Sequence, residues 1–237
     1  MADQALRGRA ADGLHEDFGP RLRAERERHG LSVRALAREV GISPSALSQI
    51  ETGRSRPSVR TLYSIVSELN ITLDELFNPD AASSDPSRTE PVDRDARDDD
   101  SADKAGPGQR KARGPVQRAD LRTVINLESG VRWERLTAAR DPEVDFMHVV
   151  YGVGAASSLD KTFLRHAGRE YGVVLSGRLR VATGFECHEL GPGDSISFDS
   201  SIPHLIENIG DEPVNAVWVV VGRNNDPRNP MGNVDED

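Results

Sequence analysis

Five polar side chains between positions 45 and 56 are of the types that bind nucleic acid. Ser45, Ser48 and Gln49 carry hydroxyl or amide groups, which hydrogen-bond to base edges, and a glutamine can pair with adenine through two hydrogen bonds. Arg54 and Arg56 follow a few residues later, and guanidinium groups are suited to phosphate oxygens. This order predicts a short segment that reads bases, followed by a loop that contacts the nucleic-acid backbone.

Two short helices joined by a tight turn are predicted to position these side chains. Ser32 is a good N-cap for a helix that runs to about Val40, and Gly41 follows as the residue most able to adopt a left-handed C-cap conformation. Ser43 caps the next helix, with Pro44 at its first position, where a missing N–H costs nothing. This is the layout of a helix-turn-helix, which places its second helix in the DNA major groove. The alternative is an ordinary helical hairpin within a larger helical domain.

Further helices are predicted on both sides of this pair. Hydrophobic spacing and capping residues predict helices over residues 18–29, 59–69 and 72–77, which gives a five-helix all-α domain. From Gly19 to Arg60 the sequence has nine arginines and four glutamates, a local charge of +5 in a chain whose formal net charge is −9. Such a local excess is the electrostatic footprint expected of a DNA-binding domain.

Residues 17–78 resemble the repressor-like helix-turn-helix family of the Cro/C1 or XRE type. The segments that carry the resemblance are LSVRALAREVGIS, SALSQIETGRSRPS and LYSIVSELNITLDELF, with the run I-E-x-G-x-x-x-P at Ile50–Pro57. The resemblance implies two groups of DNA contacts. Base-facing positions are Ser43, Pro44, Ser45, Ser48 and Gln49, and backbone-contacting positions are Arg54 and Arg56. Val33 and Pro44 replace polar side chains that are common in relatives, so base readout is expected to depend on Ser45 and Gln49.

The rest of the composition bears on location. The single cysteine, Cys187, can form no disulfide within the chain and is expected to pack as a small hydrophobic side chain, with redox sensing as the alternative. The N-terminal residues lack a signal-peptide pattern, and the longest apolar run, Ala216–Val221, is far too short to span a bilayer. We therefore expect a soluble cytoplasmic protein with no membrane partner.

Residues 81–118 are predicted to form a disordered linker. They contain eight acidic and eight basic residues and almost no large apolar ones. A flexible coil of this length has a root-mean-square reach on the order of 35 Å, so we expect the flanking domains to be loosely coupled in orientation. The predicted domains are 15–79 (helical), 80–118 (linker) and 119–225, with a disordered tail at 226–237.

The second half of the chain is predicted to be all-β. Short stretches rich in Val, Ile and aromatic residues alternate with Gly, Pro and Asp turns, which is typical of a β-sandwich or barrel. The predicted strands are 131–136, 145–153, 158–164, 170–176, 177–183, 185–190, 195–198, 204–208 and 214–221.

Residues 122–223 resemble the cupin family, a jelly-roll-like β-barrel. Two motifs carry the resemblance. The first is His166-x-x-x-Glu170 with Gly177 seven residues further on, and the second is Gly191-Pro192-Gly193-Asp194 followed by Pro203-His204-x-x-x-Asn208. In metal-binding cupins these motifs supply three His and one Glu to one ion.

The resemblance implies that His166, Glu170 and His204 occupy three of the four metal-ligand positions. Leu164 occupies the fourth, and its side chain cannot ligate. Two imidazoles and a carboxylate can still hold a divalent iron, manganese, nickel or zinc ion. The alternative is that they line a pocket for an organic ligand, to which His148, Tyr171 and Trp218 are further candidates.

These patterns together predict a transcriptional regulator that is not an enzyme. We expect it to bind a double-stranded DNA operator as a homodimer, because two half-sites require two recognition helices. A small-molecule effector in the barrel would alter operator affinity through the dimer state, or through docking of the acidic barrel near the arginine-rich motif. Two alternatives remain open: a metal-dependent cupin enzyme that carries a DNA-binding domain, and a DNA-binding scaffold whose cupin only dimerises.

Overall fold

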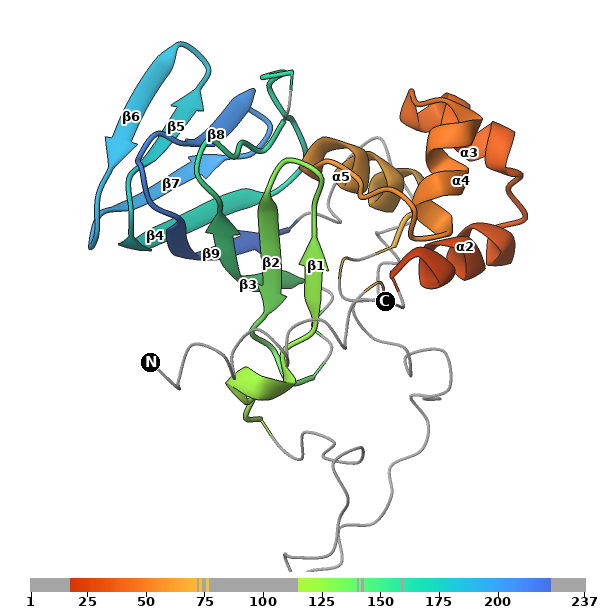
Figure 1. The fold of residues 1–237 in the computed structure, drawn as a ribbon, viewed down its shortest axis with the longest axis horizontal. Helices are drawn as coiled ribbons and strands as arrows, with labels where there is room; N and C mark the ends of the chain where they lie inside the picture. Colours follow the sequence, from red (N-terminus) through yellow and green to blue (C-terminus); the bar gives the residue numbers. More distant parts are fainter. Residues whose placement is uncertain are drawn as a thin grey trace, which may run out of the picture.

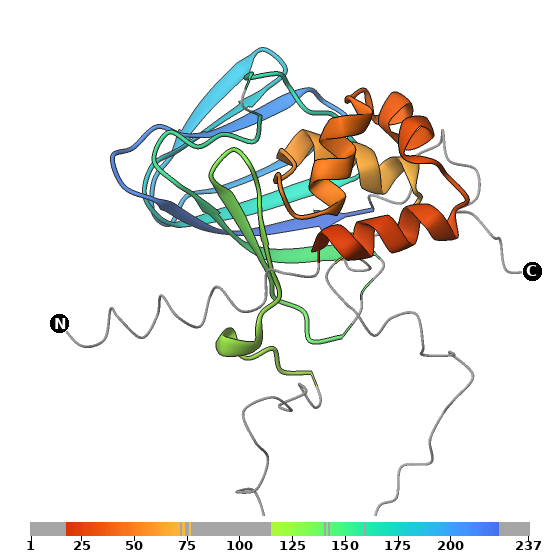
Figure 2. The same ribbon diagram turned by 45° about the vertical axis from the view of Figure 1, so that its right-hand side comes forward.

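The computed structural model describes residues 18–71, 73, 76, 115–139, 141, 143–158 and 160–222. Most of the predicted linker, the predicted tail and most of the predicted helix 72–77 lie outside these residues. Within them, a group of helices lies against one end of a β-barrel (Figures 1 and 2). No described helix combines the length and the apolar character that crossing a membrane requires.

Four helices form the described part of the N-terminal domain: α2 (Phe18–Arg28), α3 (Val33–Val40), α4 (Pro44–Glu51) and α5 (Val59–Glu68). The predicted caps are confirmed, since the Ser32 and Ser43 side chains accept hydrogen bonds from the backbone N–H groups of Ala35 and Ala46. Gly41 has φ 77°, the left-handed conformation that turns the chain between α3 and α4. The helix-turn-helix is therefore present, whereas the predicted count of five helices is not established.

A buried ion pair ties α2 to α4. The Arg26 guanidinium donates to both carboxylate oxygens of Glu51, at 2.6 and 3.0 Å, and to the Leu31 carbonyl at 2.7 Å. The two side chains are only 6% and 4% exposed. Next to this pair, Gly19 lies so close to the backbone at the end of α4 that a Cβ would come within 2.5 Å of the Ile50 carbonyl oxygen. Helix α4, the second helix of the helix-turn-helix, is thus fixed to α2 by close backbone packing and by a buried ion pair.

The C-terminal domain consists of two antiparallel sheets. The larger has the order β1 (Val124–Asn126), β2 (Val131–Arg135), β3 (Val144–Tyr151), β9 (Val214–Val221), β4 (Arg169–Ser176) and β7 (Ser195–Asp199). The smaller has the order β6 (Glu186–Leu190), β5 (Leu179–Thr183) and β8 (His204–Asn208). Alternate residues of β3, β4 and β9 are buried between the sheets, as the period of two in a strand requires.

Three details differ from the predictions. The segment 158–164 is not a strand, because its backbone pairs with β8 only through an isolated bridge at Leu164. Strand β1 was not predicted, because three residues are too short for an alternating pattern to show. Cys187 is exposed on β6 and does not pack as a buried hydrophobic side chain, because all but the last residue of this edge strand is exposed.

The two domains are in contact through α5 and the loop before it. The backbone N–H of Glu128, between β1 and β2, donates to the Pro57 carbonyl at 2.9 Å. The Tyr63 ring lies 5.4 Å from that of Trp133 on β2 and 4.6 Å from that of His166. No ion pair between described residues joins the domains, and the contacts given above are aromatic and backbone contacts. The structure thus shows a docked arrangement where loose coupling was expected.

The buried ion pair can be tested by Glu51→Gln, which keeps the shape of the side chain and removes its charge. We expect the free energy of unfolding of the helical domain to fall by about 3–5 kcal/mol, because Arg26 would remain buried with only the exposed Glu27 carboxylate, 3.5 Å away, as a counter-ion. The exposed pair Arg38–Glu39 supplies the control, and Glu39→Gln is expected to cost less than about 1 kcal/mol. Urea denaturation followed by helical circular dichroism measures both, and equal small losses would contradict the assigned role.

Candidate functional site

The predicted DNA-contacting residues form one exposed surface. Helix α4 and the loop that follows it present the side chains of Ser43, Pro44, Ser45, Ser48, Gln49, Arg54 and Arg56, all of them exposed. The Ser43 hydroxyl already accepts from the Ala46 N–H at 3.1 Å and lies 3.0 Å from the Ser45 hydroxyl. Ser43 therefore positions the start of α4, and Gln49 has the longest reach of the polar side chains on its exposed face.

The net positive charge near this surface comes from the arginines that no glutamate neutralises. Arg26 is buried with Glu51, and Arg23, Arg28 and Arg38 form ion pairs with nearby glutamates. Among the described residues from α2 to α5, four exposed arginines form no ion pair: Arg34, Arg54, Arg56 and Arg60. The charge available to phosphate groups is thus concentrated at α3, at the loop after α4 and at the start of α5.

The loop after α4 also borders the barrel. A cleft of about 350 Å³ is lined on one side by the α4–α5 loop, including Gly53 and Arg56, and on the other by strand β1. Arg56 is therefore both a predicted phosphate contact and a wall of the cleft between the domains. The docked barrel lies next to one edge of the predicted DNA-binding surface.

Inside the barrel, three side chains converge on one point. His166 precedes β4, Glu170 lies on β4 and His204 begins β8. The Glu170 Oε1 atom is 2.9 Å from His166 Nε2 and 3.3 Å from His204 Nε2, and the three ligand atoms lie within 4.8 Å of one another. The structure thus brings together the three residues that the cupin motifs single out.

Hydrogen bonds fix how these groups face one another. The Nδ1 atoms of His166 and His204 lie 2.9 and 3.0 Å from the carbonyl oxygens of Ala167 and Ile202. Because a carbonyl only accepts, each Nδ1 carries a proton, and each imidazole ring directs its Nε2 atom at Glu170. Trp218 Nε1–H donates to the other carboxylate oxygen, Oε2, at 2.6 Å, which leaves Oε1 to the two imidazoles.

Backbone spacing in the large sheet places Trp218 for this role. Trp218 on β9 lies opposite Gly172 on β4, and a Cβ on Gly172 would come within 2.1 Å of the indole ring. Glycine is thus the residue that lets the indole lie flat against β4. The indole N–H of Trp218 then reaches the carboxylate of Glu170, which precedes Gly172 by two residues on β4.

The electrostatics of the cluster keep Glu170 ionised. Burial alone would raise its pKa, but the His166 imidazole at 2.9 Å, together with His204 and Trp218, holds the pKa at about 2. Burial lowers the pKa of His204, and the charge of Glu170 only partly opposes that. The cluster therefore holds a carboxylate and a neutral imidazole near neutral pH, the protonation states of metal ligands.

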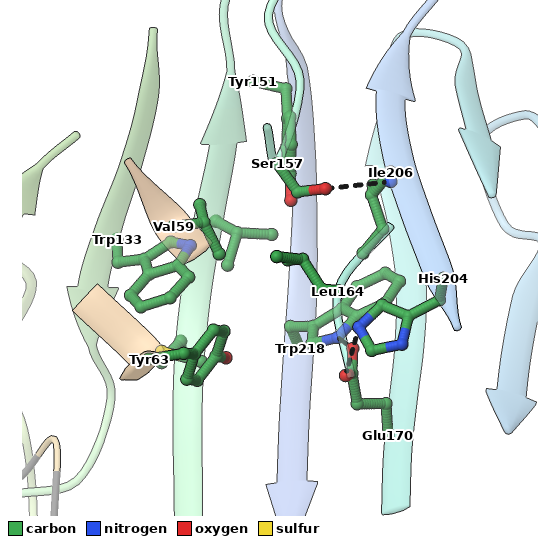
Figure 3. A pocket seen from close by; sticks show the side chains of 12 residues that line it. Val59, Tyr63, Trp133, Tyr151, Ser157, Leu164, Glu170, His204, Ile206 and Trp218 are labelled. Atoms are coloured by element: carbon green, nitrogen blue, oxygen red, sulfur yellow. Dashed lines mark hydrogen bonds and ion pairs between the residues drawn. The ribbon is translucent and has the colours of Figure 1, made fainter. Parts of the chain in front are cut away.

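The donor set fits a divalent cation. His166 Nε2 and Glu170 Oε1 are buried and have no hydrogen-bond partner among the described residues, although they face each other at 2.9 Å. Two lone pairs at this distance require a shared proton or a cation between them. Leu164 lies in the wall of the same cavity and contributes no ligand atom (Figure 3). The described residues therefore provide a set of two imidazoles and one carboxylate.

The cavity around the cluster is small and closed from the helical side. It has a volume of about 20 Å³, room for about one water molecule, with Glu170, His204 and Trp218 at its polar end (Figure 3). Its opposite wall includes Val59 and Tyr63 of α5. Tyr63 was not predicted to be part of the site. Its only distinguishing feature in the sequence is that it is an aromatic residue beside the apolar stripe of its helix.

Two of the three predicted pocket residues lie elsewhere. Trp218 lines the cavity, whereas strand alternation directs His148 on β3 and Tyr171 on β4 to the outer face of the large sheet. His148 Nδ1 lies 3.3 Å from Glu134, and Tyr171 is 44% exposed. The prediction that these two side chains line the pocket is corrected accordingly.

Comparisons with known proteins agree with both halves of this description. A helix-turn-helix family model matches residues 22–76, and a cupin domain model matches residues 147–220. The HTH-type transcriptional regulator SutR of Escherichia coli (strain K12) is 24% identical over 193 residues, which are 81% of this chain and 88% of that protein. The uncharacterized HTH-type transcriptional regulator YazB of Bacillus subtilis (strain 168) is 38% identical over 65 residues, 27% of this chain and 94% of that protein.

A solved structure shares the whole fold. The crystal structure of an HTH_3 family transcriptional regulator from Vibrio cholerae superimposes with a TM-score of 0.56 and 22% identity, covering 88% of this chain and 97% of that one. The two-domain layout is thus common to both proteins. The chain belongs to the XRE-type helix-turn-helix transcriptional regulators, with a cupin domain as its C-terminal half.

Proposed function

We propose that this DNA-binding transcriptional regulator acts in the cytoplasm as a homodimer whose cupin domain senses a small ligand, with a divalent metal ion as part of the site. The observation that carries the sensing role is the buried cluster of His166, Glu170 and His204. His166 Nε2 and Glu170 Oε1 face each other without a hydrogen-bond partner, and three hydrogen bonds to other atoms of the cluster hold the side chains in place. A barrel that only dimerises would not need such a buried binding site.

On the DNA side, the proposal assigns base readout to α4 and backbone contacts to the loop after it. Gln49 is exposed on the recognition helix, and Arg54 and Arg56 follow in the loop without ion-pair partners among the described residues. A side chain that reads a base contributes to sequence preference, whereas one that contacts phosphate contributes equally to all sequences.

The first test compares Gln49→Ala with Arg54→Ala. We expect Gln49→Ala to lose about 1–3 kcal/mol of preference for the operator over unrelated DNA. Arg54→Ala should weaken binding to both DNAs. It should also reduce the steepness of log K against log salt concentration by about 1, the contribution of one phosphate contact. Fluorescence anisotropy across a salt series measures both quantities, and an equal, salt-independent loss from the two variants would contradict the roles.

In the barrel, His166, Glu170 and His204 would hold the metal ion. When bound, the ion would supply positive charge and open coordination positions for an anionic or oxygen-containing group of the ligand. The hydrogen bonds from Nδ1 and from Trp218 orient the ligand atoms, and such outer contacts govern metal affinity.

Equilibrium dialysis with Co²⁺ or Ni²⁺ tests this site. We expect about one ion per chain, and at least a tenfold loss of affinity in His204→Ala because a ligand is removed. Leu164→His should increase affinity by adding a ligand atom within the cavity wall. The matched control is His188→Ala, since His188 is an exposed histidine on β6. Stoichiometric binding that survives His204→Ala and Glu170→Gln would place the ion elsewhere and refute the assignment.

The outer face of the large sheet supports the proposed dimer. It carries large exposed apolar side chains from the neighbouring strands β3, β9 and β4, with Val217 and Val219 of β9 partly exposed between them. The most exposed members, at 37–52%, are Phe146, Tyr171, Val173, Leu175 and Val221. A second copy of the same face would cover them, as a two-fold interface requires.

Val173→Arg places a charge at the centre of this face. We expect the variant to sediment as a monomer at concentrations where the native chain is a dimer, and to lose affinity for a two-half-site operator. The control is Phe185→Arg, which removes an exposed aromatic side chain from the hairpin between β5 and β6 and should leave the dimer intact. A native chain that sediments as a monomer, or a dimeric Val173→Arg, would overturn this interface.

A second candidate function is metal-dependent catalysis in the barrel. Two imidazoles and one carboxylate with open positions form the set used by non-haem iron oxygenases. The small volume of the cavity opposes this function in the docked arrangement, because about 20 Å³ leaves no room for an organic substrate. Turnover of an organic substrate by the metal-loaded chain would favour catalysis over ligand sensing as the function of the barrel.

A further inference from the structure

Tyr63 connects the DNA-binding domain to the interior of the barrel. It belongs to α5, yet its ring stacks on His166 with a centroid distance of 4.6 Å and an interplanar angle of 28°. It also packs at 5.4 Å against Trp133 of β2 and lines the cavity that contains Glu170 and His204 (Figure 3). One side chain of the helical domain is thus part of the cupin site.

The space around Tyr63 decides what can bind while the domains are docked. With the phenol ring in place, the cavity holds about 20 Å³, enough for a metal ion or one water molecule. Apart from its polar end and Ser157, the lining is apolar and aromatic, and it includes Trp133, Met147, Val149 and Leu164. Any organic molecule that reaches Glu170 and His204 from this side must occupy the volume of the Tyr63 ring.

We propose that Tyr63 is an interdomain plug, so that binding of an organic effector in the barrel and docking of the helix-turn-helix domain on it exclude each other. The proposal rests on the ligand-sensing role proposed above. The effector class is a small ring or chain of about the size of a phenol, with a polar group for Glu170 and His204. Since binding and docking compete, each shifts the other by the same factor.

Undocking of Tyr63 from the barrel would affect the DNA-binding surface, because the two lie close together. Tyr63 lies on the helix that follows the Arg54–Arg56 loop, and Arg56 itself lines the cleft between that loop and strand β1. Removal of Tyr63 from the barrel opens this cleft and frees the edge of the loop. Two docked contacts therefore move together: the aromatic plug and the Glu128–Pro57 backbone hydrogen bond at 2.9 Å.

The experiment uses the full chain, with p-cresol as a probe that reproduces the tyrosine side chain. We expect Tyr63→Ala to bind p-cresol with a Kd of about 1 mM or tighter, because the volume that the Tyr63 ring fills beside Trp133 and His166 becomes accessible to the probe. The native chain and Tyr63→Phe, which keeps the ring, should bind it at least tenfold more weakly. Calorimetric titration measures the binding, and near-ultraviolet circular dichroism verifies that each variant is folded.

Small-angle scattering of the same proteins supplies the second readout. We expect a larger radius of gyration for Tyr63→Ala than for the native chain and for Tyr63→Phe, since loss of the plug separates the domains. An unchanged radius together with equal p-cresol affinity in all three proteins would refute the plug. Neither measurement uses DNA or the natural effector, so the plug can fail while operator binding stands, and operator binding can fail while the plug stands.

Discussion

The buried carboxylate of Glu170 is the group on which the site depends. Its Oε2 atom is held by the Trp218 indole, and its Oε1 atom faces two imidazoles whose other nitrogens are fixed by backbone carbonyls. A carboxylate that is 3% exposed requires such partners, since an isolated buried charge is strongly unfavourable. The same partners leave lone pairs facing one another, and this makes the site a receptor for a proton or a cation.

The aromatic contact between Tyr63 and His166 extends this site into the DNA-binding domain. His166 therefore has three neighbours with different roles: a carbonyl that sets its tautomer, a carboxylate at its Nε2, and a tyrosine from α5 on its ring face. A change at the cluster reaches α5 directly, without a rigid lever through the linker. On the other side of α5, the buried Arg26–Glu51 pair fixes the recognition helix to the rest of its domain.

Local patterns in the sequence predicted much of this arrangement. The caps at Ser32 and Ser43 and the turn at Gly41 predicted α3 and α4, and the cupin motifs predicted that His166, Glu170 and His204 meet. The DNA contacts at Gln49 and Arg54 stay predictions. Strand alternation was overlooked at His148 and Tyr171, whose side chains face outward. The pairing of Arg26 with Glu51, 25 residues apart, and the stacking of Tyr63 on His166 depend on tertiary contacts, which no local pattern encodes.

The central claim is that the helix-turn-helix domain docks on the cupin cavity, although a flexible linker was predicted between them. The most direct test is a distance measurement by double electron–electron resonance between spin labels on the native Cys187 of β6 and on Glu39→Cys of α3, both exposed. We expect one narrow distance distribution in the otherwise native chain and a broad one after Tyr63→Ala. A distribution equally broad in both, with the width of a free coil of 38 residues, would contradict the account.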